Sequence, residues 1–270
     1  MEIITGVFTK MDLMLKESIK YTLDYSEKLI ISPDMDGFIS AQLINRYNGA
    51  KVVGTYDKNI LCLADDIDPE DCLFVDCDMN RERYVSIGNH MRLVKDNMST
   101  RGFNPNSFFG INKYSAKFPF ATAYLISFAT EIETSATEII RMAYVDSTLK
   151  NMELYSDNMR IWSDRMKCPA VDYVISATDY AKQLDDELRV TYTTQSFTSK
   201  RYGKKRYIEE VNAALIKENV PHETIKMGKK YMSDKVGLNT VMRYNGDIIS
   251  YAEVYGGEYS VTYDQEIAWT

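Results

Sequence analysis

The sequence predicts an α/β fold in which residues 1–185 form a doubly wound parallel sheet and residues 186–270 form a smaller α+β domain. Between residues 28 and 146, short apolar runs alternate with amphipathic stretches, an order typical of parallel strands joined by crossover helices. Several of these runs end in aspartate. A chain of 270 residues is long enough for one large or two small domains with buried cores.

The first strand is predicted at residues 28–31, where a lysine is followed by three apolar residues. Pro33 ends this strand because proline has no backbone N–H to donate to a neighbouring strand. Residues 38–47 carry apolar side chains at helical spacing and predict a helix that packs back on the sheet. Asp34 and Asp36 therefore lie at the carboxyl end of a strand, where open α/β sheets build their sites.

The later elements continue this alternation. We expect strands at residues 51–56, 72–78 and 90–97, a helix at 119–132, and a helix or strand at 138–146. The ends of these segments supply four further acids, Asp76, Asp78, Asp96 and Asp146. In the smaller domain we expect a helix at 207–218 and a hairpin that turns at Asn245–Gly246.

Charge and composition narrow the classes of partner. The net charge of −7 argues against a surface that binds polyanions everywhere, so a nucleic-acid contact needs a local basic patch. No apolar run reaches the length of a membrane span, and the amino terminus lacks the pattern of a signal peptide. The four cysteines include no CxxC pair, which favours a reducing compartment. We therefore expect a cytoplasmic protein without membrane partners, in which Cys72 and Cys77 are buried.

Aspartates at the ends of successive elements form the main candidate site. A single aspartate is ordinary in a turn, but several at one edge of a parallel sheet would converge on one crevice. Hard oxygen ligands suit Mg²⁺ or Mn²⁺, and two such ions can clamp an in-line displacement at phosphorus. The chain has only two histidines, so carboxylates must make up most of such a site.

The order of these motifs resembles the DHH phosphoesterase superfamily, which includes RecJ-type exonucleases, oligoribonucleases and cyclic-dinucleotide phosphodiesterases. The resemblance covers about residues 28 to 150. Asp34-Met35-Asp36-Gly37 matches the first motif, Asp76 the second and Asp146 the fourth. The third motif, Asp-His-His, is matched by Asp96-Asn97-Met98, in which both histidines are replaced. An alternative alignment places Gly88-Asn89-His90 at this motif and restores one histidine.

The resemblance implies a metal-dependent phosphodiesterase that acts on short single-stranded nucleic acid or on small linear or cyclic nucleotides. It implies that Mn²⁺ or Mg²⁺ is bound by Asp34, Asp36, Asp76 and Asp146, with Asp76 bridging two ions. Asp96 and Asn97 would lie at the rim of the site, and Asp78 is a possible substitute ligand. In the family, the first histidine of the third motif binds metal and the second faces the substrate phosphate.

Loss of the motif histidines leaves a second interpretation open. A member of a superfamily can lose its metals and keep its fold, because the site is carried by a few side chains. The alternative is therefore a catalytically degenerate RecJ-like protein that binds nucleic acid or a protein partner.

A basic segment at residues 200–207 is the candidate contact for the phosphates of a strand. Two tyrosines, Tyr202 and Tyr207, accompany its cations and could stack on bases. A solvated loop that leads into a helix is the alternative interpretation. The five cations are Lys200, Arg201, Lys204, Lys205 and Arg206.

Overall fold

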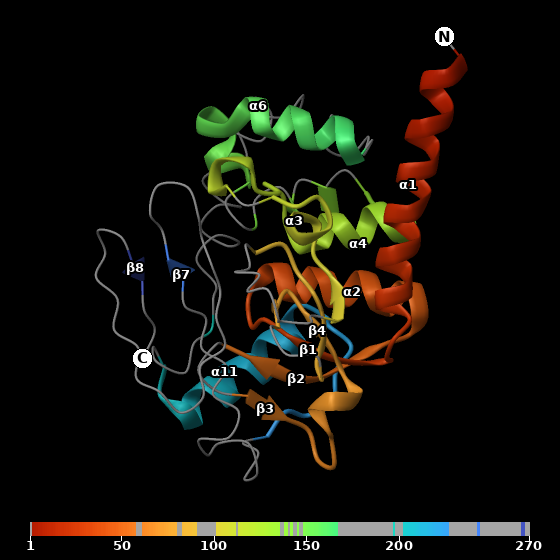
Figure 1. Cartoon of the computed structure of the whole chain (residues 1–270). Helices are drawn as coiled ribbons and strands as arrows, with labels where there is room; N and C mark the ends of the chain where they lie inside the picture. Colours follow the sequence, from red (N-terminus) through yellow and green to blue (C-terminus); the bar gives the residue numbers. More distant parts are fainter. Residues whose placement is uncertain are drawn as a thin grey trace.

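A six-stranded sheet lies at the centre of the computed structural model (Figure 1). The strands are β1 (Lys28–Ile31), β2 (Lys51–Tyr56), β3 (Leu61–Leu63), β4 (Leu73–Val75), β5 (Val85–Ile87) and β6 (Arg101–Phe103). Their order across the sheet is β3-β2-β1-β4-β5-β6, and every neighbouring pair is parallel except β2 with β3. The predicted α/β class is therefore confirmed.

The structure describes residues 2–57, 61–79, 83–90, 101–111, 113–135, 138–139, 141–142, 145, 148–166, 197, 202–226, 242–243 and 266–267. The remaining residues are outside this description.

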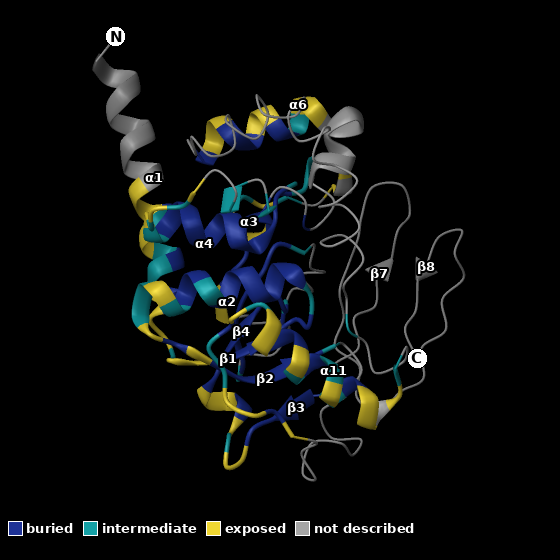
Figure 2. Ribbon diagram, turned by 180° about the vertical axis from the view of Figure 1, so that it is seen from behind, coloured by how far each residue is buried: buried dark blue, intermediate teal, exposed yellow. Residues whose placement is uncertain are grey.

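Strands β1 and β4 carry three consecutive apolar residues each because both faces of the sheet are covered. Leu29 and Ile31 of β1 face one core cluster, whereas Ile30 faces a second cluster on the opposite side. Leu73 and Val75 of β4 join the first cluster and Phe74 joins the second. Strands buried on both faces have continuous apolar runs in place of strict alternation, as these two strands do. Figure 2 shows the central strands as buried.

The described helices contribute their apolar side chains to the first core cluster. The longer ones are α1 (Glu2–Leu23), α2 (Met35–Asn48), α4 (Thr122–Thr130), α6 (Thr148–Met166) and α11 (Lys204–Lys217). The sequence predicted α2, α4 and α11 to within a few residues at each end, but we did not expect α1. Leu15, Ile19 and Leu23 of α1 lie four residues apart on one helical face and are buried. The described residues do not show helices on both faces, so the doubly wound arrangement stays a prediction.

The chain changes direction across the sheet between β1 and β4. From β1 it passes through α2 to β2 on one side, and later returns to β4 on the other side. Such a switch leaves a crevice at the carboxyl ends of the two strands, because the connections lead away in opposite directions. The acids that follow β1 and β4 therefore lie where this type of sheet offers a site.

The third and fourth predicted strands differ from those in the structure. Residues 73–75 form β4, and Asp76 leaves the strand with a left-handed φ of 56°. The fourth strand was predicted at 90–97, but His90 lies in the loop after β5 and residues 91–97 lie outside the description. The strand next to β4 is Val85–Ile87, which we did not predict. A run of three residues with serine at its centre is too short to give a clear apolar period.

Segments late in the chain also pack on the sheet. Tyr207, Val211 and Leu215 of α11 belong to the first core cluster. After α11, the N–H of Val52 donates to the carbonyl of Pro221 at 2.9 Å, which pairs this segment with β2. The domain boundary predicted near residue 185 and the turn at Asn245–Gly246 lie outside the described residues, so the two-domain division stays a prediction. Strands β7 (Met242–Arg243) and β8 (Glu266–Ile267) form a separate antiparallel pair.

Cys62, Cys72 and Cys77 are buried, as expected for small apolar side chains at Cys72 and Cys77. Burial raises the pKa of the Cys62 thiol and of the Cys72 thiol to about 12. Both thiols therefore stay protonated near neutral pH and are poor nucleophiles.

The turn between β1 and α2 requires glycine at position 37. A Cβ there would overlap the backbone carbonyl of Ser32, which cannot move aside without distorting β1. Helix propensity alone would make Gly37→Ala stabilising by about 1 kcal/mol. We expect the overlap to dominate, and Gly37→Ala to lower the free energy of unfolding by about 1–3 kcal/mol in urea denaturation. An unchanged or raised midpoint would contradict this packing.

Candidate functional site

Two pairs of acids follow neighbouring strands at the carboxyl edge of the sheet. Asp34 and Asp36 follow β1, and Asp76 and Asp78 follow β4. The last residues of these strands, Ile31 and Val75, are partners in the parallel register. The acids from the first and second predicted motifs thus share one edge of the sheet.

Asp34 caps the helix that follows it. It is the N-cap residue of α2, and its Oδ1 accepts a hydrogen bond from the N–H of Gly37 at 3.1 Å. The hydroxyl of Ser32 donates to Oδ2 of Asp34 at 2.5 Å. Both contacts are local, and the one from Gly37 satisfies a backbone donor that the first turn of any helix leaves unpaired.

Asp36 caps a different helix. Its Oδ2 accepts from the N–H of Thr122 at 2.8 Å, and its Oδ1 accepts from the N–H of Ala123 at 2.9 Å. The N-cap residue of α4 is Ala121, which has no side chain that could do this. Asp36 is 1% exposed. A carboxylate from α2 therefore takes over the capping of α4, which fixes the two helices against each other.

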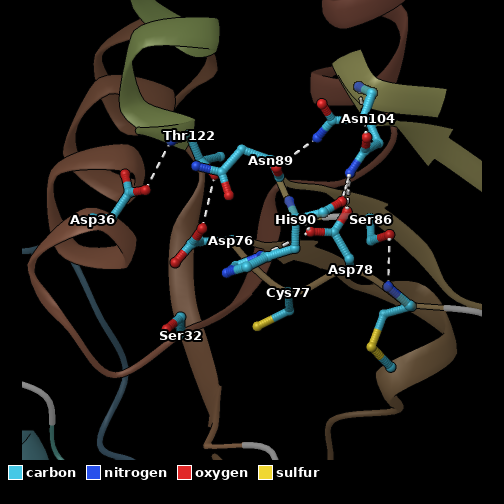
Figure 3. Close-up of polar contacts among 12 residues, drawn as sticks. Ser32, Asp36, Asp76, Cys77, Asp78, Ser86, Asn89, His90, Asn104 and Thr122 are labelled. Atoms are coloured by element: carbon cyan, nitrogen blue, oxygen red, sulfur yellow. Dashed lines mark hydrogen bonds and ion pairs between the residues drawn. The ribbon is translucent and has the colours of Figure 1, made fainter. Parts of the chain in front are cut away.

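Asp76 reaches the same end of α4. Its Oδ1 accepts from the hydroxyl of Thr122 at 2.8 Å, so Thr122 contacts both Asp36 and Asp76, as Figure 3 shows. Asp76 is 2% exposed and has a left-handed backbone, which is uncommon outside glycine. Residues held in such conformations often belong to functional sites.

Asp36 and Asp76 place two carboxylates in one buried region. The N-terminus of α4 offsets part of their charge, since a helix terminus is equivalent to about half a positive charge. Two carboxylates carry about two negative charges when ionised. The helix terminus alone therefore offsets only part of this charge.

His90 adds a ring nitrogen at this edge. Its Nδ1 lies 2.9 Å from Oδ2 of Asp78, and the ring extends from Asp78 toward Asp76 in Figure 3. Asn104, which follows β6, donates from Nδ2 to Oδ1 of Asp78 at 2.7 Å. Successive strand ends after β4, β5 and β6 thus contribute Asp78, His90 and Asn104.

Of the two alignments of the third motif, only one falls on residues that the structure describes. Asp96 and Asn97 lie outside the described residues, so their predicted place at the rim stays untested. The alternative, Gly88-Asn89-His90, directly follows β5, the strand next to β4. Asn89 is buried, and its Nδ2 donates to the carbonyl of Phe120 at 2.8 Å. Residues 88–90 of the alternative alignment, in which one histidine is kept, thus follow the strand beside β4, and their match to the family motif stays a prediction.

The carboxylate oxygens of the described residues are the type of ligand that a hard divalent cation prefers, but they are too few to form a metal site on their own. Asp36 and Asp76 are held in place by hydrogen bonds, as the carboxylate ligands of metals usually are. Within the part of the chain that the structure describes, no group of three or more His, Cys, Asp and Glu side chains could hold a metal ion. The further ligand that the resemblance predicts is Asp146, which lies outside the described residues.

The basic segment is linked to the acidic edge through aromatic rings. The N–H of Phe197 donates to the carbonyl of Pro33 at 2.9 Å, next to Asp34. The Phe197 ring stacks on Tyr202 with centroids 6.0 Å apart, and the guanidinium of Arg206 lies 5.6 Å from the Tyr202 ring centroid. Through Phe197, the side chains of Tyr202 and Arg206 are thus connected to the β1–α2 turn.

An open hollow of about 490 Å³ lies at the start of α11, and its lining mixes charges of both signs. Arg206 pairs with Glu210 at 3.2 Å. The lining residues are Tyr202, Gly203, Lys205, Arg206, Glu209 and Glu210. Lys200 and Arg201 lie outside the described residues.

Tyr207 does not have the role that we expected. It is fully buried, and its hydroxyl lies 3.2 Å from the hydroxyl of Thr55 on β2. Burial raises the pKa of the Tyr207 hydroxyl well above its usual value. The prediction that Tyr207 stacks on bases is therefore wrong, because the first turn of α11 points this ring into the core.

Sequence reasoning missed Thr122 and Asn104, whose roles depend on contacts distant in the chain. Thr122 lies 86 residues from Asp36 and 46 from Asp76. Asn104 opens a turn ahead of Pro105, and this local signal hides its contact with Asp78. A polar residue at the first position of a largely apolar helix was the available signal for Thr122.

Comparisons of the chain with protein-family models, with curated proteins and with solved structures give no match. None of the described helices combines the length and the apolar character that a membrane span requires. Function must therefore be inferred from the chemistry of the site.

Removal of the Thr122 hydroxyl tests how strongly it supports Asp76. Thr122→Val keeps the shape of the side chain but leaves Oδ1 of Asp76 without this donor. We expect the free energy of unfolding to fall by about 1–3 kcal/mol in urea denaturation with a chelator present. Thr122→Ser keeps the hydroxyl and is the matched control, with a smaller loss. Equal stability of the Val and Ser variants would show that the bond contributes little.

Proposed function

We propose that this chain is a metal-dependent phosphodiesterase related to the DHH phosphoesterases, with its site at the carboxyl ends of β1 and β4. The observation that carries the proposal is the convergence of two buried carboxylates, Asp36 and Asp76, on Thr122. Both come from motifs whose order resembles that superfamily, and they lie at the switch point of a parallel sheet.

Repulsion between the two carboxylates favours a site with a bound cation over a site without one. Two ionised carboxylates that contact the same threonine repel each other, and the N-terminus of α4 offsets only part of their charge. A divalent cation removes this repulsion and is bound by oxygen ligands of this kind. Asp36, Asp76 and the predicted Asp146 would hold the cation, with Asp34 at the adjacent turn.

The residues of the chain would orient the ligands and the substrate. A divalent cation supplies Lewis-acid activation of water and neutralises a phosphate oxygen. Thr122 fixes Asp76, and the N–H groups of α4 fix Asp36, so neither carboxylate must reorganise when a cation binds. Without a cation, a phosphate could not approach two carboxylates, so nucleotide binding at this edge should require a metal.

The substrate class that this arrangement suits is a short single strand or a small nucleotide. The basic segment begins α11 with Lys204, Lys205 and Arg206, although cations at a helix N-terminus oppose the helix dipole. A phosphate chain would relieve this opposition. Phe197 and Tyr202 connect the segment to the turn that carries Asp34, which is a short path for a strand leaving the site.

A second candidate function is favoured by the hydrogen bonds of Asp34 and Asp36. Each of these carboxylates caps a helix, and this structural role would keep both acids in a chain that had lost its metals. On this interpretation the chain is a catalytically degenerate RecJ-like module that binds nucleic acid or a protein partner.

Metal titration separates the two functions. We expect Mn²⁺ to bind the wild type in calorimetry, and Asp76→Asn to weaken that binding at least about tenfold, since a ligand matters no less than its supporting groups. Asp164→Asn, which removes an exposed carboxylate on α6, is the charge-matched control and should bind as the wild type does. Hydrolysis of labelled dinucleotides, cyclic dinucleotides and oligonucleotides should need Mn²⁺ and be lost in Asp76→Asn.

The outcomes of this titration are distinct. Equal Mn²⁺ binding by the wild type and Asp76→Asn would remove the metal site. Mn²⁺ binding without hydrolysis of any of the three substrates would favour the degenerate module.

The basic segment is tested by substitution of Lys204, Lys205 and Arg206 with alanine. We expect weaker binding of an oligonucleotide and a salt slope reduced by about 0.7 for each phosphate that the protein no longer neutralises. Binding of a dinucleotide in Mn²⁺ should change little, because it would fit inside the acidic edge. The control replaces three exposed lysines elsewhere, Lys28, Lys51 and Lys113. An unchanged affinity and salt slope would show that the segment is only a solvated helix start.

A further inference from the structure

The imidazole of His90 is held in one orientation by Asp78. Oδ2 of Asp78 lies 2.9 Å from both the backbone nitrogen and the ring Nδ1 of His90. Nδ2 of Asn104 donates to Oδ1 of Asp78 at 2.7 Å and to the carbonyl of His90 at 2.8 Å. The ring, the loop that carries it and the carboxylate are therefore fixed together across three strand ends.

Gly88 makes room for this arrangement. A Cβ at position 88 would overlap the carboxylate of Asp78, with the carboxyl carbon only 2.7 Å away. The φ of Gly88 is not in the left-handed region, so its backbone does not require glycine. The absence of a side chain at this position is explained by the space that the Asp78 carboxylate occupies.

The two side chains differ in their access to solvent. The Asp78 side chain is 1% exposed, whereas the His90 side chain is 17% exposed. Buried carboxylates are costly unless several donors surround them, and the two nitrogens of His90 and the amide of Asn104 supply these donors. Asp78 is thus the internal support, and the ring is the part that a ligand can reach.

The contact also determines which ring nitrogen carries the proton. An ionised carboxylate can only accept, so Nδ1 must be the donor to Asp78. Nε2 then belongs to the side of the ring that extends toward Asp76 in Figure 3. A histidine oriented in this way by a carboxylate is the usual arrangement of an imidazole that acts on a ligand.

We propose that Asp78 is a positioning residue that presents His90 to the phosphate of a bound nucleotide. The Asp78 carboxylate does so from the space that is left open because Gly88 has no side chain. The identity of the ligand rests on the function proposed above, but the geometry of the ring does not. In the alternative alignment, the third motif has aspartate where this chain has Gly88. The carboxylate missing from position 88 is supplied by position 78, so the motif is rearranged and its carboxylate kept.

The first test is the protonation of the ring, measured by NMR on protein labelled with ¹⁵N-histidine. The chain has only two histidines, and His90→Gln identifies the signals. We expect Nδ1 of His90 to carry the proton in the wild type. His222, whose Nδ1 lies 2.7 Å from the carbonyl of Val220, is the internal reference. A wild-type ring protonated only at Nε2 would overturn the proposal, whether or not the protein hydrolyses anything.

Three variants then test Asp78 and Gly88. Asp78→Ala removes the carboxylate, and Gly88→Ala displaces it without a change of charge; both should abolish the preference for Nδ1–H at His90 and leave His222 unchanged. The double variant Asp78→Gly with Gly88→Asp returns a carboxylate to position 88 and should restore the preference. If Asp78→Ala fails to fold, Gly88→Ala decides the question. An unchanged His90 signal in Gly88→Ala, or a folded double variant without restoration, would overturn the proposal.

The ligand is tested with a dinucleotide in Mn²⁺. We expect Gly88→Ala and His90→Gln to weaken its binding or turnover at least tenfold, while Mn²⁺ binding stays within a fewfold of the wild type. Retained dinucleotide binding in both variants would overturn the assignment of His90 to the phosphate. Failure of the wild type to bind Mn²⁺ would instead refute the proposed function, and the NMR result would still decide the role of Asp78.

Discussion

The negative charge of Asp36 and Asp76 beneath the N-terminus of α4 is the constraint on which the site and much of its surroundings depend. Both carboxylates are almost completely buried, and both bind Thr122. Buried charge is tolerated only where donors and opposite charge surround it. This requirement fixes α4 against α2 and brings a helix N-terminus to the ends of β1 and β4. The same carboxylates are the proposed cation ligands, which connects the stability of this region to its proposed chemistry.

The acidic edge combines structural and chemical roles in the same side chains. Asp34 and Asp36 each cap a helix, and this alone would be a sufficient reason for their presence. Asp76 combines burial, a left-handed backbone and a hydrogen bond from the hydroxyl of Thr122. For this reason Asp76, and not the more visible Asp34–Asp36 motif, is the most informative residue for the proposed function.

The next two strand ends form a second unit beside the acids. Asp78, His90 and Asn104 follow β4, β5 and β6, and their hydrogen bonds join three loops. Gly88 allows this unit to form because the carboxylate occupies the place of a side chain. Phe197 and Tyr202 connect the first motif to the start of α11. An acidic centre flanked by an oriented imidazole and a basic helix start is consistent with a phosphodiester as ligand.

The sequence by itself determined the α/β class, strands β1 and β2, the helices α2, α4 and α11, and the placement of Asp34, Asp36 and Asp76 at one edge. These follow from apolar runs, helical spacing and turn residues, which are local properties of the chain. It failed at β5, where three residues are too few for a period, and at Tyr207, whose direction depends on how α11 packs. Only the tertiary structure decided that Thr122 joins two acids, that His90 follows the strand beside β4, and that Asp78 fills the space at Gly88. Each of these depends on residues brought together from distant positions, and a hydrogen bond between such residues leaves no period or spacing in the sequence.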